Sequence, residues 1–277
     1  MGKGFGFLFS CQSDIIKIMK NIKEITQEEL DDLKVVVFDL DGVVIPVGTE
    51  LKENQDGTEL HIKSHQLSAG FINNLEKLKK HLKIGFSSGR NILYLKSLVN
   101  EIFDKRIILQ AENGNITFLG GKINHPIYPD EYFGQLRDIK EKIKEMMKSD
   151  QRIRGFEPKL FILTVHCDEM EEIPNLVKEV AGDKLYCLWT NEGYDIGSVE
   201  MSKGEAIKNL AKELGIKPKQ IMTTGNNYND QEMLEVGKGV TVKPKRMAAE
   251  YFIEHKKEEL GGELLAEFLL DYFKSRD

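Results

Sequence analysis

The fold is decided by residues 35–42, which read Val-Val-Val-Phe-Asp-Leu-Asp-Gly. An apolar run rich in β-branched residues is typical of a strand buried on both faces of a parallel sheet. Asp39 and Asp41 then fall at the carboxyl end of this strand, the edge where open α/β sheets bind ligands. One carboxylate could ligate a metal and attack phosphorus, and the other could move a proton to a leaving oxygen. For this motif alone, a strand-ending turn with capping aspartates is an equal alternative.

Strands and helices alternate on either side of this stretch. The alternation favours an α/β fold with a doubly wound parallel sheet. A helix with Phe71, Leu75, Leu78 and Leu82 on one face follows the first strand. The other predicted core elements are strands at 82–86, 106–110, 221–224 and 239–242, and helices at 91–99, at 203–214 and from Asp230.

The middle of the chain has a different pattern. It predicts a hairpin (116–119 and 123–125), helices at 129–147 and 173–180, and strands at 160–166, 185–189 and 194–196. We therefore expect an inserted α+β cap domain over 113–197 and a core domain formed by 33–112 and 198–277, with a cleft between them. Residues 1–32 are predicted to be an N-terminal helical extension, from the apolar spacing around Ile15 to Ile22 and a capping box at Thr26.

Three more polar features follow core strands or open a helix. Ser88 and Gly89 follow the strand at 82–86, where a hydroxyl and a glycine amide at a helix N-terminus form an anion cradle. Lys203 opens a helix, which hints at a nearby anion. Residues 225–230, Gly-Asn-Asn-Tyr-Asn-Asp, place oxygen-bearing side chains in a turn that suits Mg²⁺. Taken one at a time, each feature has a simpler structural interpretation: Ser88 as a helix cap, Lys203 as a solvated lysine, and 225–230 as an Asx-rich turn. Together, in this order, the features favour a phosphate site.

Composition narrows the class of protein. The net charge of −6 over 277 residues argues against non-specific binding to nucleic acid or to an anionic membrane. The three cysteines, Cys11, Cys167 and Cys187, lack metal or disulfide spacing, and no run reaches transmembrane length. We therefore expect a cytoplasmic protein. The oligomeric state is not predicted.

In this order and with these spacings, the residues resemble the four motifs of the haloacid dehalogenase superfamily of phosphatases. The resemblance covers residues 35–255 and rests on 39–43, 88–90, Lys203 with Gly204, and 225–230. Residues 111–114, Ala-Glu-Asn-Gly, resemble members with a large α/β cap, such as the Cof-type and the sucrose- or mannosyl-phosphoglycerate-phosphatase-like enzymes. The resemblance implies a Rossmann-like core with a cap and a Mg²⁺-dependent phosphatase for a small phosphorylated metabolite.

The resemblance also implies residue roles. Asp39 would form an aspartyl-phosphate, and Asp41 would act first as general acid and then as base. The phosphoryl oxygens would be held by Ser88, Gly89, Lys203 and Asn229. The Mg²⁺ ligands would be Asp39, the carbonyl of Asp41, Asn226 and Asp230. Mg²⁺ and Lys203 would offset the repulsion between a phosphate dianion and these carboxylates.

One position departs from the family pattern, because Asn226 stands where the fourth motif usually has an aspartate. The uncharged amide would bind Mg²⁺ more weakly, or catalysis would be lost and phosphate binding kept. A sugar phosphate is the expected substrate, and a phosphomutase or a regulatory binding protein are the alternatives. Candidates for recognising the leaving group are Asn113, His166, Glu192 and Tyr194. Residues 48–57 form either a flap over the site or a charged exposed hairpin.

Overall fold

The computed structural model describes residues 19–54 and 56–276. Within them the larger sheet has nine strands in the order β1-β15-β14-β13-β2-β5-β6-β7-β8. The pairings from β1 to β6 are parallel, and β7 and β8 join antiparallel. Its strands are β1 (Lys20–Asn21), β2 (Val35–Phe38), β5 (Lys83–Ser87), β6 (Ile107–Ala111), β7 (Ile116–Leu119), β8 (Lys122–Asn124), β13 (Ile221–Gly225), β14 (Lys238–Thr241) and β15 (Tyr251–Phe252).

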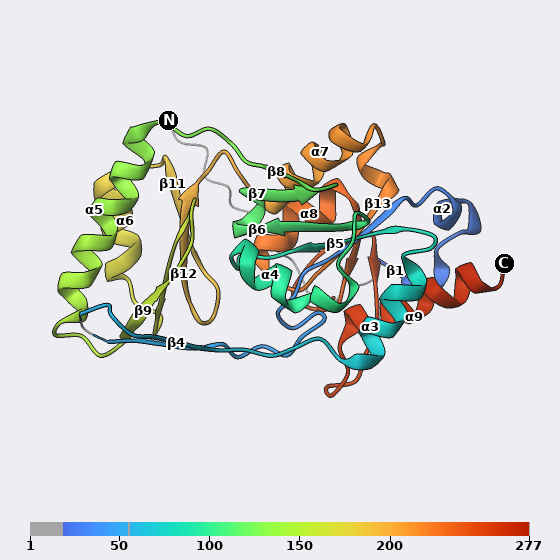
Figure 1. The fold of residues 1–277 in the computed structure, drawn as a ribbon, viewed down its shortest axis with the longest axis horizontal. Helices are drawn as coiled ribbons and strands as arrows, with labels where there is room; N and C mark the ends of the chain where they lie inside the picture. The colour runs from blue at the N-terminus through green and yellow to red at the C-terminus, as the bar shows by residue number, and fades with distance from the viewer. Residues whose placement is uncertain (1–18, 55, 277) are drawn as a thin grey trace.

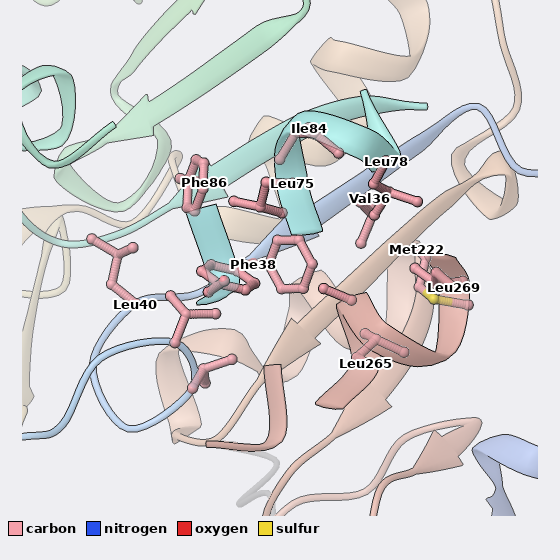
Figure 2. Close-up of a cluster of buried hydrophobic side chains, with 14 of the residues drawn as sticks. Val36, Phe38, Leu40, Leu75, Leu78, Ile84, Phe86, Met222, Leu265 and Leu269 are labelled. Carbon is pink, nitrogen blue, oxygen red and sulfur yellow. The ribbon is translucent and has the colours of Figure 1, made fainter. Parts of the chain in front are cut away.

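Strand β2 shows why both faces of this sheet are covered. Successive side chains point to opposite faces, so Val36 and Phe38 lie in one apolar cluster and Val35 and Val37 in another. The first cluster includes α3 (Ala69–Leu78), α4 (Ile92–Leu98) and α9 (Gly261–Lys274), and the second includes α7 (Lys203–Leu214) and α8 (Gln231–Val236). Figure 2 shows Phe38 among side chains of the first cluster. The doubly wound α/β fold predicted from the sequence is confirmed.

A second, smaller sheet has four antiparallel strands in the described residues, in the order β11-β12-β10-β9. They are β9 (Ile153–Glu157), β10 (Leu163–Cys167), β11 (Leu185–Trp189) and β12 (Gly193–Ser198). Helices α5 (Asp130–Met147) and α6 (Glu172–Ala181) pack on one face, the side away from the larger sheet (Figure 1). We call this sheet and its two helices the cap. Its other face is turned toward the larger sheet.

Two parts of the predicted insert differ in the structure. The hairpin β7–β8 continues the nine-stranded sheet, because β7 pairs with the edge of β6 through Leu109 and Phe118. The span assigned to the insert, 113–197, therefore contains two strands of the larger sheet. Strand β9 was not predicted, since Gly155, at a φ of +143°, and the charged residues beside it interrupt its apolar pattern.

The N-terminal segment also differs from the prediction where it is described. The predicted helix around Ile15 lies largely outside the described residues. Residues 20–21 form the edge strand β1, and Ile22 is buried in the core. Thr26 caps α2 (Gln27–Asp31) through a capping box, as predicted. Glu29 in this helix bonds Lys238 at 2.9 Å and Tyr251 at 2.7 Å, so the described part of 1–32 belongs to the core.

A hairpin of β3 (Glu50–Glu53) and β4 (Leu60–Lys63) follows β2 and reaches from the core to the cap (Figure 1). Glu192 Oε1 of the cap accepts hydrogen bonds from the backbone N–H groups of Gly48 at 2.9 Å and Thr49 at 3.0 Å. In the other direction, Glu53 Oε2 accepts one from Phe156 N at 2.8 Å. The segment from residue 48 is therefore fastened to the cap.

In the described part of the chain, no helix combines the length and the apolar character that crossing a bilayer requires.

Candidate active site

Asp39 follows β2 directly, at the carboxyl end of the parallel strands. Its Oδ1 accepts a hydrogen bond at 2.7 Å from Lys203 Nζ, which also donates to Asp230 Oδ1 at 2.7 Å. Lys203 is 1% exposed and is the first residue of α7, far along the sequence from Asp39. One buried cation thus holds two carboxylates that come from separate strand ends.

Electrostatics make Asp39 an unusual carboxylate. Burial raises its pKa most strongly and the charge of Asp230 raises it further, whereas Lys203 lowers it; the result lies above the usual range. Burial lowers the pKa of Lys203, but Asp230 and Asp39 raise it by more, so Lys203 stays charged. A carboxylate poorly solvated by its surroundings is a better nucleophile than one fully hydrated in water.

The turn at 226–230 is organised around Asp230. Its Oδ2 accepts hydrogen bonds from the backbone N–H groups of Asn226 at 2.9 Å and Asn227 at 3.0 Å. This arrangement aims the Asn226 side chain at the first motif, where Nδ2 lies 2.7 Å from the carbonyl oxygen of Asp41. Glycine suits position 42, because its φ of +76° is strained for other residues and a Cβ would lie 2.4 Å from that amide nitrogen.

Asp41 is held by Arg90, which the sequence assigned no role. Arg90 Nε donates to Asp41 Oδ2 at 2.9 Å and its Nη2 to Oδ1 at 2.6 Å, a bidentate pair. Arg90 also bonds the Thr49 hydroxyl and lies over the Tyr94 ring. The orientation of Asp41 is therefore fixed by two bonds.

Ser88 and Gly89 precede α4 as predicted, and Ser88 is 2% exposed. The Ser88 hydroxyl accepts a hydrogen bond from Arg90 N at 3.2 Å. A Cβ on Gly89 would lie 2.9 Å from Asp195 Oδ2 of the cap. The phosphate loop (residues 88–90) is thus packed directly against a cap carboxylate.

A cavity of about 970 Å³ lies between the two sheets. Of the predicted site residues, it is lined by Asp39, Asp41, Ser88, Gly89, Asn226 and Asn229. Lys203 and Asp230 do not line it; they are buried and reach it through Asp39. The structure therefore brings all eight predicted residues to one place.

Only some of the four candidates for recognising the leaving group line the cavity. His166 and Glu192 line the cavity, and Glu192 also holds residues 48–49. Asn113 does not line it but bonds Asp195, which does. Tyr194 is a packing residue, since its hydroxyl donates to Met170 O at 2.8 Å inside the cap.

Five polar cap residues line the cavity and are here called the cap cluster: Glu157, Lys159, Thr164, His166 and Asp195. Sequence reasoning named His166 and missed the other four. The cluster lies on the cap face toward the core, because β10 alternates Thr164 and His166 with apolar residues that pack under the helices. Lys159 Nζ lies 3.3 Å from Glu157 and 3.5 Å from Asp195. The polar alternation in 163–167 was the signal that could have found it.

The oxygen atoms at residues 39–41 and at Asn226 fit a hard cation. A half-turn of the Asn226 amide would place its oxygen where Nδ2 now lies, 2.7 Å from the Asp41 carbonyl oxygen. Two oxygens that close repel unless a cation lies between them, and adjacent ligands of an octahedral Mg²⁺ are about 2.9 Å apart. The described residues contain no group of three His, Cys, Asp or Glu that could hold a metal, so amide and backbone oxygens would have to contribute.

Comparison with known proteins relates part of this chain to a known family. Residues 130–250 match the family described as haloacid dehalogenase-like hydrolase. A search of curated proteins finds no match.

Solved structures share the fold over most of the chain. A trehalose-6-phosphate phosphatase related protein superposes with a TM-score of 0.64 at 14% identity, over 88% of this chain and 100% of its own. A trehalose-6-phosphate phosphatase from Aspergillus fumigatus gives 0.59 at 16%, over 94% and 100%. A protein from Bacteroides thetaiotaomicron, described among phosphatases of the haloalkanoate (HAD) enzyme superfamily, gives a TM-score of 0.62 at 16% identity, over 90% of this chain and 98% of its own. Such identities establish a common fold. The family match over residues 130–250 agrees with the resemblance to the haloacid dehalogenase superfamily that the sequence motifs carry.

Proposed function

We propose that this hydrolase is a Mg²⁺-dependent phosphomonoesterase that acts on a small sugar phosphate, with Asp39 as its nucleophile. The observation that carries the proposal is the position of Asp39, which lines the cavity shared with the cap while Lys203 holds its Oδ1 at 2.7 Å. A carboxylate in this position can attack phosphorus and form an aspartyl-phosphate, which water then hydrolyses to inorganic phosphate.

The other residues support this reaction in distinct ways. Ser88, Gly89 and Asn229 line the cavity beside Asp39 and can donate to phosphoryl oxygens. Asp41 lines the same cavity and would protonate the leaving oxygen and later take a proton from water. Proton donation would require Arg90 to release one of the Asp41 oxygens. Asp39, the carbonyl of Asp41 and Asn226 would hold Mg²⁺. Asp230 would join them only by releasing Lys203 from Oδ1 or the amides of 226–227 from Oδ2. When bound, the cation would offset phosphate charge beside the carboxylates.

The cap cluster supports a polyhydroxylated leaving group. It offers carboxylates that accept hydrogen bonds and a lysine that donates them, and sugar hydroxyls do both. Burial raises the pKa of Glu157, but Lys159, His166 and Arg90 lower it by more, to about 2, so Glu157 is a carboxylate. Buried ion pairs contribute little to stability compared with apolar packing. Their presence on a cavity wall therefore favours a role in binding.

Replacing Glu157 with glutamine should weaken catalysis on sugar phosphates selectively. Losing one charged acceptor costs about 10- to 100-fold in kcat/KM, mainly through KM. With p-nitrophenyl phosphate, whose leaving group has no hydroxyls for the cap, kcat/KM should change less than about twofold. Glu179→Gln, on the cap helix facing away from the cavity, is the matched control and should alter neither substrate. Equal losses on both substrates would exclude Glu157 from leaving-group recognition.

Replacing Asn226 with aspartate should lower the Mg²⁺ concentration needed for half-maximal activity. The added carboxylate binds Mg²⁺ more strongly than an amide does, by about tenfold if the site gains 1.4 kcal/mol. Titration of activity with MgCl₂ in wild type and variant measures the shift. An unchanged or higher Mg²⁺ requirement would remove Asn226 from the metal site.

A phosphate-release screen over a panel of phosphorylated metabolites, with Mg²⁺ and with EDTA, tests the proposed function. Inorganic phosphate from a sugar phosphate, lost with EDTA, is the expected result. A positional isomer in place of phosphate would make the protein a mutase. No turnover of any ester, with no beryllium fluoride adduct at Asp39, would contradict an enzymatic role.

A further inference from the structure

Glu112 and Asn113 form the corner between β6 and β7, and both have left-handed backbone conformations, with φ values of +53° and +55°. Two consecutive non-glycine residues in this region indicate a constraint imposed by the surroundings. Their backbone is tied to the phosphate loop: Glu112 N donates to Arg90 O at 3.0 Å, and Asn113 N donates to Ser88 O at 3.0 Å. The corner therefore keeps a fixed position relative to residues 88–90.

The Glu112 side chain crosses to the cap. It is buried, and its oxygens accept hydrogen bonds from three successive backbone N–H groups of the β9–β10 loop: Leu160 at 2.9 and 3.1 Å, Phe161 at 2.7 Å and Ile162 at 3.3 Å. Lys159 of the cap cluster belongs to the same loop and directly precedes Leu160. A buried carboxylate with these donors holds the loop, and with it the backbone that carries Lys159.

The Asn113 side chain makes a second connection. Its Nδ2 donates to Asp195 Oδ2 of the cap cluster at 2.9 Å. The Asn113 amide oxygen would lie 3.3 Å from a Cβ on Gly89, so the phosphate loop, the corner and Asp195 are in direct contact. Two neighbouring residues thus connect one loop of the core to two members of the cap cluster.

We propose that Glu112 and Asn113 are positioning residues that set the distance between the phosphate loop and the cap cluster, and so select sugar phosphates by the spacing between phosphate and hydroxyls. The inference rests on the proposed function. Neither residue lines the cavity, so both act through the groups they hold. A site that binds both ends of its substrate loses rate when the two halves shift relative to one another, whereas a substrate bound only at the phosphate does not.

Glu112→Gln tests the first connection, because the amide keeps the shape but turns an N–H group toward backbone donors. We expect kcat/KM on the best sugar phosphate to fall about 10- to 100-fold, as for a displacement of about 1 Å. For p-nitrophenyl phosphate the change should stay below about twofold, since its leaving group does not need the cap cluster. Amides 160–162 should exchange with deuterium faster than in wild type.

Asn113→Gly tests the second connection and retains the left-handed backbone. It removes the 2.9 Å bond to Asp195, together with the longer contacts at 3.4 Å to the Tyr186 hydroxyl and from Asn229 Nδ2. It should show the same selective loss on the sugar substrate. Glu213→Gln, which removes a carboxylate bonded to Asn124 within the core, is the matched control and should leave both substrates unchanged.

Equal losses on both substrates, or no loss on either, would overturn the inference. So would unchanged exchange at 160–162 in Glu112→Gln, and this readout does not require activity. If wild type hydrolyses no ester, the proposed function fails by itself, and the exchange measurement still decides whether Glu112 holds the cap loop.

Discussion

Asp39→Asn should lower the rate of phosphate release by about 10⁴-fold or more, since an amide cannot form the covalent intermediate and removal of a nucleophile costs this much in other enzymes. The measurement is single-turnover and steady-state phosphate release on the best substrate of the screen, with Mg²⁺. Equal activity in both proteins would identify a contaminating phosphatase as its source.

The same variant should remain folded, because burial and the neighbouring Asp230 raise the pKa of Asp39 and make its charged form costly. A neutral amide avoids this cost. We therefore expect the free energy of unfolding in Mg²⁺-free buffer at pH 7.5 to be unchanged or higher than in wild type, as measured by urea denaturation. A clear loss of stability would show that the bond to Lys203 outweighs the repulsion.

Lys203→Met should abolish activity and also destabilise the fold by about 3–5 kcal/mol at neutral pH, the usual cost of leaving buried charges without their partner. Lys203 is the cation bonded to both Asp39 and Asp230, and each contact measures 2.7 Å. Urea denaturation of wild type and variant measures the difference. Lys208→Met, in the same helix but on an exposed pair, is the control and should change stability by less than about 1 kcal/mol.

The destabilisation should depend on pH with a definite sign. The folded pKa of Asp39 is raised above its unfolded value, so the folded state binds more protons, and its stability falls as pH rises through the folded pKa. Lys203 lowers the pKa of Asp39, so its removal raises that pKa further and makes stability depend more strongly on pH. The loss in Lys203→Met should therefore be larger at pH 8 than at pH 5.5, and a loss independent of pH would mean that lost packing is the cause.

The core of the fold was predictable because its signals are local. An apolar run such as 35–38 and the alternation of strand and helix lengths depend only on neighbouring residues. The hairpin β7–β8 could not be assigned to its sheet in this way, because pairing with β6 depends on which edge is free. Strand β1 is two residues long and is held by contacts to Tyr251 and Phe252, far along the chain.

The candidate site was predictable where residues follow predicted strands. Asp39, Ser88 and Asn226 meet because the carboxyl ends of parallel strands share one edge. The contact between Arg90 and Asp41 was not predictable, since it depends on a side-chain direction at the start of α4. Lys159 was not predictable either, because nothing in the local sequence indicates that its loop is turned toward Asp39.

The hairpin β3–β4 has a consequence for how a product leaves. The hairpin segment and the cap each donate to the other. The N–H groups of residues 48 and 49 donate to Glu192 of the cap, and Phe156 N of the cap donates to Glu53. Any swing of the cap that widened the exit must break these three bonds or carry the hairpin along. In the reaction proposed above, departure of the product would therefore depend on the hairpin, and substitutions in the hairpin that weaken these bonds would alter turnover without changing the groups around Asp39.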